Sequence, residues 1–232
     1  MSSRKNLMLA VCAATAVGSA HTQNGSTQAE LIRYDFTMVV RENLFDNNNG
    51  PLAELQVGQI GQFSITLLDD KDLFADFSTE TAQAYSIEEV ALQIGSITSA
   101  GDPDHVPSTG FLDTFMLSNN ARASSHPQAA ISDGMGAIIN LDNPILGFTV
   151  FSITQQTPFD SEPTIFSSLD LPREPFDLSL ITSENHFVIQ DPADGFQRVN
   201  FRFTNVEVTV IPTPMSAGLF ALTGLAAMRR RR

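Results

Sequence analysis

The sequence predicts an all-β fold for the body of this 232-residue chain, an antiparallel β-sandwich of jelly-roll-like type. Short runs rich in β-branched and aromatic residues recur along the body, and clusters of Gly, Pro, Asn and Asp separate them. Within several runs, apolar residues alternate with polar ones, which is the period of a half-buried strand. Short strands at regular spacing, with turn residues between them, are typical of a β-sandwich.

The clearest strand is predicted at 31–40, where the even-numbered residues are apolar and Arg33, Asp35 and Thr37 are polar. The same alternation predicts a second strand at 61–68. The other runs have a strand-like composition. They lie at 86–95, 111–117, 137–141, 145–153, 176–181, 186–190 and 196–211.

The last run changes the parity of its apolar residues. They are odd-numbered from Val199 to Phe203 and even-numbered from Val206 to Val210. A β-bulge at 204–205 would return both sets to one core, whereas the alternative is two strands joined by a turn. We predict the bulge, because Asn tolerates a left-handed backbone and no Gly or Pro marks a reversal there.

The N-terminus has the pattern of a secretory signal peptide, predicted at 1–20 with a signal helix. Basic residues at 4–5 precede an apolar run at 7–17, and small residues follow up to Ala20, where cleavage is expected. Cleavage would remove Cys12, the single cysteine, so the exported body would have no disulfide. We expect residues 21–211 to form one domain.

The C-terminal segment, residues 212–232, combines Pro212 and Pro214 with an apolar run from Met215 to Met228 and an arginine cluster. The cluster consists of Arg229, Arg230, Arg231 and Arg232. A helix of that apolar run would span about 21 Å, less than the roughly 30 Å of bilayer hydrocarbon. The prolines favour an extended hinge, and the arginines favour the cytoplasmic side. The segment is thus a short hydrophobic helix suited to transient membrane insertion.

This tail resembles the PEP-CTERM sorting signal, with Pro212-Thr213-Pro214 in place of Pro-Glu-Pro. The resemblance implies that an exosortase, a membrane cysteine peptidase, removes the tail and releases the protein to the cell envelope or exopolysaccharide matrix of a Gram-negative bacterium. The order of the YDFT, GQFSIT and IGSI pieces in the body is also similar to PEP-CTERM exported domains. It favours a strand at 86–95, although Ser86 and Glu89 also have the spacing of a helix capping box. The alternative for the tail is a plain C-terminal anchor.

Charge excludes one class of partner. Of 13 basic residues, two lie in the predicted signal peptide and four in the tail, so seven remain in the body against all 26 acidic ones, a net charge of −19. Such a body repels phosphate backbones and anionic lipid surfaces. Nucleic acid is therefore not an expected partner.

No catalytic motif is recognisable, so the sequence predicts a protein that is not an enzyme. It contains no G-x-S-x-G, P-loop, H-E-x-x-H or C-x-x-C pattern, and its four histidines, His21, His105, His126 and His186, are isolated. No cofactor is predicted. Calcium is the alternative, because three acidic loops could supply oxygen ligands. Their candidate ligands are Asp46, then Asp69, Asp70 and Asp72, then Asp191 and Asp194.

Together these observations predict an exported structural or interaction protein of the envelope or extracellular matrix, with the exosortase as its processing enzyme and exopolysaccharide or envelope components as partners. The alternative is an exported carbohydrate-active hydrolase or a calcium-dependent glycan-binding protein. The absence of Trp and the presence of only two Tyr count against stacking of sugars on aromatic rings.

Overall fold

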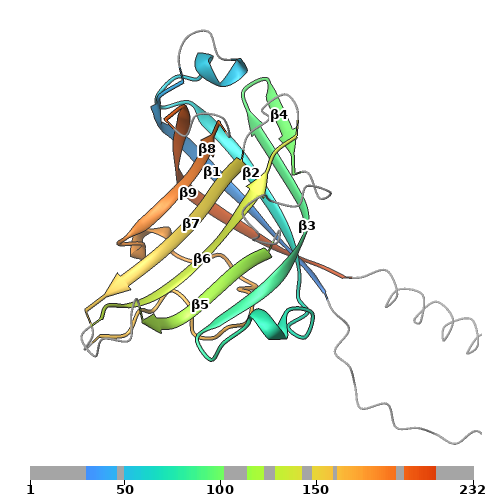
Figure 1. Cartoon of the computed structure of the whole chain (residues 1–232), viewed down its shortest axis with the longest axis vertical. Helices are drawn as coiled ribbons and strands as arrows, with labels where there is room; N and C mark the ends of the chain where they lie inside the picture. Colours follow the sequence, from blue (N-terminus) through green and yellow to red (C-terminus); the bar gives the residue numbers. More distant parts are fainter. Residues whose placement is uncertain are drawn as a thin grey trace, which may run out of the picture.

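The computed structural model describes residues 30–45, 50–101, 114–122, 129–142, 148–158, 161–191 and 196–212. These residues form an all-β structure of antiparallel strands with three short 3-10 helices (Figure 1). The strands are β1 (Leu31–Asn43), β2 (Ile60–Leu68), β3 (Ala82–Ile94), β4 (Ile97–Ala100), β5 (Thr114–Arg122), β6 (Ile131–Asn140), β7 (Phe148–Thr157), β8 (Glu184–Gln190) and β9 (Arg198–Ile211). The 3-10 helices are η1 (Pro51–Glu54), η2 (Ala75–Phe77) and η3 (Leu178–Leu180).

Eight of the strands close into a barrel. The sheet order is β2-β1-β9-β8-β7-β6-β5-β3-β4, and an additional pairing of β2 with β3 closes the ring. The predicted all-antiparallel class is confirmed, but the jelly-roll-like sandwich is wrong, because one sheet curls onto itself. Except for β4 and β5, consecutive strands pair as neighbours. Each strand of a sandwich or a barrel turns one face to the core, so the alternation in the sequence does not distinguish them.

Aromatic side chains fill the interior of the barrel. Phe36 lies 4.7 Å from Phe203 and 5.3 Å from Phe151 between ring centroids. Phe63 lies 4.6 Å from Phe187 in the same way. All five rings are at most 1% exposed. These centroid spacings are those of favourable aromatic pairs, so the barrel encloses a packed core.

Most of the predicted strands are confirmed, including the ambiguous run at 86–95, which lies within β3. Strand β6 begins at Ile131, earlier than the predicted 137, because two glycines obscured the pattern. One of them, Gly136, sits so close to β7 that an added Cβ would approach the carbonyl oxygen of Phe151 to 2.7 Å. A small residue is therefore required at this position.

The predicted strand at 176–181 is wrong. Leu178–Leu180 form η3, and Asp177 caps it by accepting a hydrogen bond from the backbone of Ser179. Pro172 and Pro175 precede this segment, and proline has no backbone N–H for a sheet ladder. The apolar residues here are only partly buried against the core. They cover the barrel instead of joining its wall.

The predicted bulge in the last strand is confirmed. Strand β9 is continuous, and its register with β1 shifts because Thr37 pairs with Asn205 whereas Met38 pairs with Phe203. Thr204 is the extra residue. Phe203 and Val206 are both buried in the single core cluster on either side of it.

The first and last strands bring the two chain ends together. Leu31 at the start of β1 pairs with Ile211 at the end of β9 (Figure 1). The predicted signal helix at 1–20 and the C-terminal helix lie outside the described residues. Within the described ranges, no helix has the length and hydropathy needed to cross a bilayer.

Candidate functional site

Polar side chains gather in a strap that crosses one end of the barrel. They also line two grooves on its outer wall. We define the strap as residues 161–181, which connect β7 to β8. It covers the barrel end from which the two chain ends leave. Its buried residues Phe166 and Leu171 belong to the core cluster, and Phe166 lies 5.5 Å from Phe176 in an edge-on contact.

Two side chains at the ends of the barrel strands hold the start of the strap. Gln155 accepts hydrogen bonds from the backbone N–H groups of Thr164 and Ile165, both at 2.8 Å. Asp133 is 0% exposed and accepts from the backbone N–H of Phe166 at 3.0 Å. The other oxygen of Asp133 accepts from Asn120, which takes a left-handed backbone (φ 53°) to present its N–H. Both oxygens of the buried Asp133 carboxylate are thereby satisfied.

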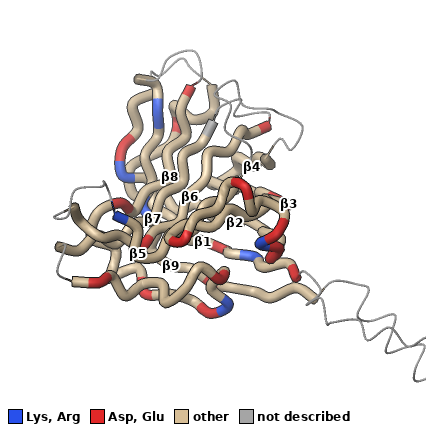
Figure 2. Tube along the Cα trace, turned by 60° about the horizontal axis from the view of Figure 1, so that its bottom comes forward, with Lys and Arg blue, Asp and Glu red and all other residues tan. Residues whose placement is uncertain are grey.

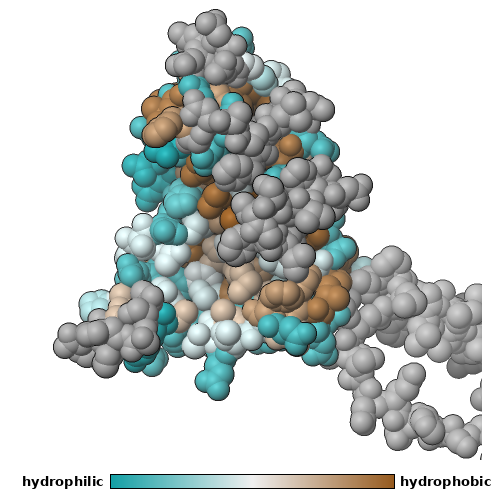
Figure 3. Space-filling model, in the orientation of Figure 1, coloured by the Kyte–Doolittle hydropathy of each residue, from teal (hydrophilic) through white to brown (hydrophobic). Residues whose placement is uncertain are grey.

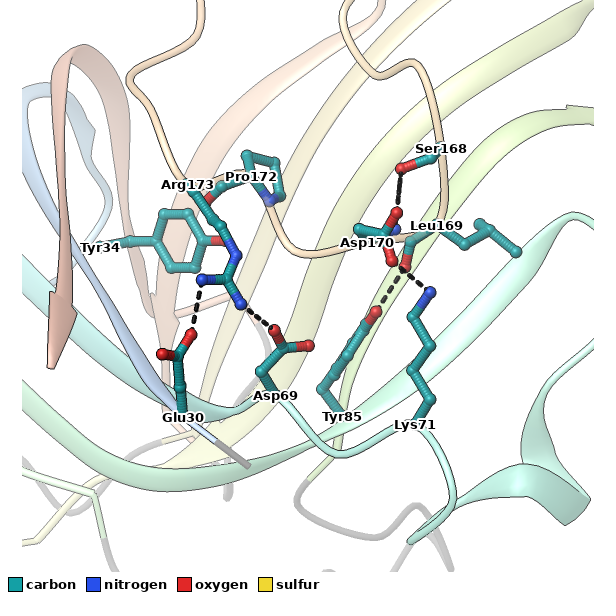
Figure 4. A network of polar contacts seen from close by, with 10 residues as sticks. All are labelled: Glu30, Tyr34, Asp69, Lys71, Tyr85, Ser168, Leu169, Asp170, Pro172 and Arg173. Atoms are coloured by element: carbon teal, nitrogen blue, oxygen red, sulfur yellow. Dashed lines mark hydrogen bonds and ion pairs between the residues drawn. The ribbon is translucent and has the colours of Figure 1, made fainter. Parts of the chain in front are cut away.

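Both tyrosines of the chain hold the middle of the strap (Figure 4). Tyr34 donates its hydroxyl to the carbonyl oxygen of Pro172 at 2.8 Å, and Tyr85 donates to that of Leu169. Burial raises the pKa of each phenol well above its usual range, and the nearby carboxylate of Asp69 raises it further. The two hydroxyls are therefore donors that stay protonated, and they anchor the strap.

Ion pairs complete the strap at its surface (Figure 4). Arg173 bridges Glu30 at 2.5 Å and Asp69 at 2.8 Å, and Lys71 pairs with Asp170. The hydrogen bond from Lys71 holds the pKa of the Asp170 carboxyl below its usual value. Hydrogen bonds from Arg173 to its two carboxylates raise its own pKa. The strap thus closes this barrel end with backbone, phenol and ionic contacts.

The first groove lies on the outer wall where β1, β9 and β8 are adjacent. Its volume is about 510 Å³. Its lining combines polar and charged side chains with two apolar ones. The lining residues include Arg41, Glu42, Asn185, His186, Val188 and Asn200.

Two contacts fix the wall of this first groove. Asn200 donates to Glu42 at 2.6 Å. Asn185 accepts from the backbone N–H of Phe203 at 2.9 Å and donates to its carbonyl oxygen at 3.2 Å. The side chain of Asn185 thus continues the β8–β9 ladder beyond its last backbone pair, Phe187 with Phe201.

The second groove, with a volume of about 380 Å³, lies across β5, β6, β7 and β8. Figure 3 shows brown apolar surface between teal flanks on this side of the barrel. Met116, Ile138 and Val150 supply apolar lining, and Glu184 and His186 lie at the β8 side. His186 lines both grooves, so the two are neighbours on the outer wall.

A serine, a histidine and a glutamate meet in the second groove. Ser152 pairs with His186 across β7 and β8, and Glu184 lies two residues from His186 on the same strand face. The Ser152 hydroxyl donates to the Glu184 carboxylate. A Ser–His relay requires the serine to donate to the imidazole, so this arrangement is a polar surface contact and not a triad.

The calcium candidates are dispersed. Asp69 pairs with Arg173, and Asp70 accepts from the backbone N–H of Asp72 at 3.0 Å, as in a turn. Asp191 follows β8 at the opposite barrel end. Asp46 and Asp194 lie outside the described residues, as do the sorting residues Pro214 and Arg229 to Arg232. Within the described part of the chain, no three His, Cys, Asp or Glu side chains lie close enough to hold one metal ion.

His186 is a residue singled out from the sequence, whereas the groove residues around it are not. Of the four histidines, His186 is the one that lies within the described residues. His21, His105 and His126 lie outside them. Asn200 lies between Arg198 and Arg202 in a predicted strand, and that spacing alone indicates one outward face. Nothing in the local sequence indicates that Arg41 lies at the groove, because its position depends on how β1 pairs with β9.

Comparison with known proteins adds no assignment. No protein-family model matches the chain, no curated protein matches it, and no solved structure matches it.

Proposed function

We propose that this protein is an exported, non-enzymatic protein of the bacterial envelope or extracellular matrix, delivered through its C-terminal segment and acting through its outer surface. One observation carries the proposal. Leu31 pairs with Ile211, so the segments before and after the barrel join it at the same end, the strap end. A chain held in a membrane by either segment would present the rest of the barrel away from the membrane.

The connection to the tail supports processing by a peptidase. Pro212 directly follows the last residue of β9 and is exposed. A cut beyond this point would leave every strand of the barrel intact. The resemblance of the tail to the PEP-CTERM signal makes an exosortase the expected processing enzyme.

The packed barrel interior directs ligands to the outside. The inward-facing aromatic residues occupy the space that a ligand-carrying barrel leaves open, the strap covers one end and η1 covers the other. The outer grooves are therefore the surfaces through which envelope or matrix components would be bound. For the alternative, an exported carbohydrate-active hydrolase, the two described grooves offer the carboxylates of Glu42 and Glu184.

Mass spectrometry of the protein purified from the envelope and extracellular fractions tests the proposal. We expect the mature chain to begin at His21 and to lack the C-terminal arginine cluster. Replacing Pro212 and Pro214 with Ala should block removal of the tail, and replacing the four terminal arginines with Ser should weaken retention in the membrane. An intact Met1 or Ser2 in those fractions, or unchanged processing of both variants, would contradict the proposal.

A further inference from the structure

Three arginines lie together on the outer wall beside the first groove. Arg198 and Arg202 flank Asn200 at two-residue spacing on β9, so all three point outward. Arg202 pairs with Val39 of β1, and Arg41 is the extra residue where the register of β1 shifts. All three arginines are exposed. Figure 2 shows blue segments beside β8, with red segments among them.

These arginines differ from the basic residues that have carboxylate partners. Arg33 pairs with Asp35 at 2.9 Å, and Lys71 and Arg173 form the ion pairs of the strap. In the described part of the chain, no ion pair or side-chain hydrogen bond involves any arginine of the cluster at 41, 198 and 202. Three of the seven basic residues of a body with 26 acidic ones thus lie side by side without a carboxylate partner. Arg198 and Arg202 are four residues apart on an extended strand, about 14 Å, so their mutual repulsion is largely screened at physiological salt. Their exposed charges remain available to an anionic ligand.

The adjoining groove supplies neutral hydrogen-bonding groups and one carboxylate, Glu42, which accepts a hydrogen bond from Asn200 at 2.6 Å. Asn185, His186 and Asn200 can donate to and accept from hydroxyl groups, while Val188 gives a small apolar contact. A volume of about 510 Å³ lies within the range of ligand pockets. The second groove begins at the shared residue His186, so an elongated ligand can continue across β8 onto β7 and β6.

We propose that this surface binds an acidic polysaccharide through the carboxylate groups of its uronate sugars. The planar guanidinium group matches a carboxylate in two parallel hydrogen bonds, and the cluster offers three such groups. The groove amides and the imidazole bind sugar hydroxyls. The ligand is held by charge and hydrogen bonds, without the stacking on aromatic rings for which the chain lacks Trp.

The net charge distinguishes this ligand from nucleic acid. Duplex DNA carries one charge per about 1.7 Å of axis and would be repelled by the acidic body as a whole. A polyuronate carries one charge per sugar, so its charge density is lower than that of duplex DNA and the acidic body repels it less. At physiological salt the Debye length is about 8 Å, which screens the distant carboxylates more than the direct contacts.

The inference rests on the proposed function only in that export would bring the protein to the compartment that contains the polysaccharide. Binding itself is a property of the folded barrel, so it is tested on purified protein, separately from export and processing. Loss of binding with correct processing would remove the inference alone, and faulty processing with intact binding would remove the proposed function alone.

Isothermal titration calorimetry with oligogalacturonate at 0.15 M salt tests the inference. We expect binding, and we expect it to weaken about tenfold for the fully methyl-esterified oligomer, which has the same sugars without the charge. The variant R198Q/R202Q should lose about tenfold in affinity for the acid form and keep the thermal unfolding temperature of the parent. The matched control, R173Q, removes an exposed arginine at the opposite barrel end and should bind like the parent.

Four outcomes of the calorimetry would overturn the inference. They are absence of binding to oligogalacturonate, equal binding of the methyl ester, unchanged binding by R198Q/R202Q, and an equal loss in R173Q. Dextran sulfate serves as the test of mere polyanion attraction. If it competes as well as the uronate at equal charge concentration, the site does not recognise carboxylated sugars and the inference fails.

Discussion

The two ends of the barrel are closed by different means. At the strap end, a segment of about 20 residues is held by Gln155, a buried carboxylate, two phenols and several ion pairs. At the other end, the single turn η1 inserts Leu52 and Leu55 and is fixed chiefly by Asn43, which donates to both of their carbonyl oxygens at 2.8 and 2.9 Å. The unpaired arginines lie nearer this second end.

This difference separates stability from binding. The charges of the strap end are neutralised by partners within the chain, where both chain ends also leave. The arginines near the η1 end keep their charge exposed. A surface whose charges are already paired has little to offer a ligand, so we infer that one end anchors the chain and the other binds the proposed ligand.

The largest expected effect is at the buried carboxylate of the strap end. Replacing Asp133 with Ala leaves the backbone N–H groups of Asn120 and Phe166 without an acceptor. Two buried unsatisfied donors should lower the free energy of unfolding by about 3 kcal/mol. Urea denaturation followed by circular dichroism measures the change.

A matched variant shows whether the loss comes from the hydrogen bonds. Asp133→Asn keeps one carbonyl oxygen and should lose about half as much stability. If Asp133→Ala unfolds within about 0.5 kcal/mol of the parent, the strap is not anchored through this residue.

At the opposite end we expect a smaller loss from Asn43→Ala. The change removes the amide that donates to the carbonyl oxygens of Leu52 and Leu55 and the oxygen that accepts from the N–H of Phe45. The free energy of unfolding should fall by about 1–2 kcal/mol, because these groups are partly buried and water can replace some contacts. Hydrogen exchange should show faster opening at 50–55 with the strap unchanged. Faster exchange in the strap as well would mean that the two ends are not independent.

Features that depend on residues close together in the sequence could be predicted, and features that depend on distant residues could not. The bulge at Thr204 follows from a parity change within one strand, so local pattern suffices. Closure of the barrel does not follow, because pairing of β1 with β9 joins segments more than 150 residues apart. The strap was missed for the same reason. Asp133 and Gln155 lie outside the predicted strands at 137–141 and 145–153. Nothing in the local sequence marks them before the fold places the N–H groups of 164–166 against them.

Alkaline pH should affect the strap end selectively. Burial raises the pKa of Tyr34 and Tyr85 above about 10, the value expected in the unfolded chain. Above that pH the unfolded chain releases protons that the folded chain keeps, so stability is fully present below about pH 10 and falls as the pH rises. Unfolding temperatures across this range and tyrosinate absorbance should report the same transition, since the chain has only these two tyrosines and no Trp.

Phenylalanine variants separate the two phenols. Tyr34→Phe and Tyr85→Phe should each lower the free energy of unfolding by about 1 kcal/mol at neutral pH and each make the alkaline decline shallower. A tyrosinate titration centred near pH 10 in the folded protein would show that the phenols are open to solvent, contrary to their contacts with Pro172 and Leu169.

The smallest expected effect concerns the exposed ion pairs of the strap. Arg173 bridges two carboxylates, but its side chain is 50% exposed, so water and salt screen the interaction. Arg173→Gln should lower the free energy of unfolding by less than about 1 kcal/mol at low salt and by a smaller amount at 1 M salt. Chemical denaturation at the two salt concentrations measures this difference.

Arg202→Gln, which removes an exposed arginine of the unpaired cluster, is the matched control. It should show no such loss, because Arg202 has no carboxylate partner in the described chain. If both variants lose stability equally, pairing with carboxylates does not distinguish the two ends, and the division between an anchoring end and a recognising end fails.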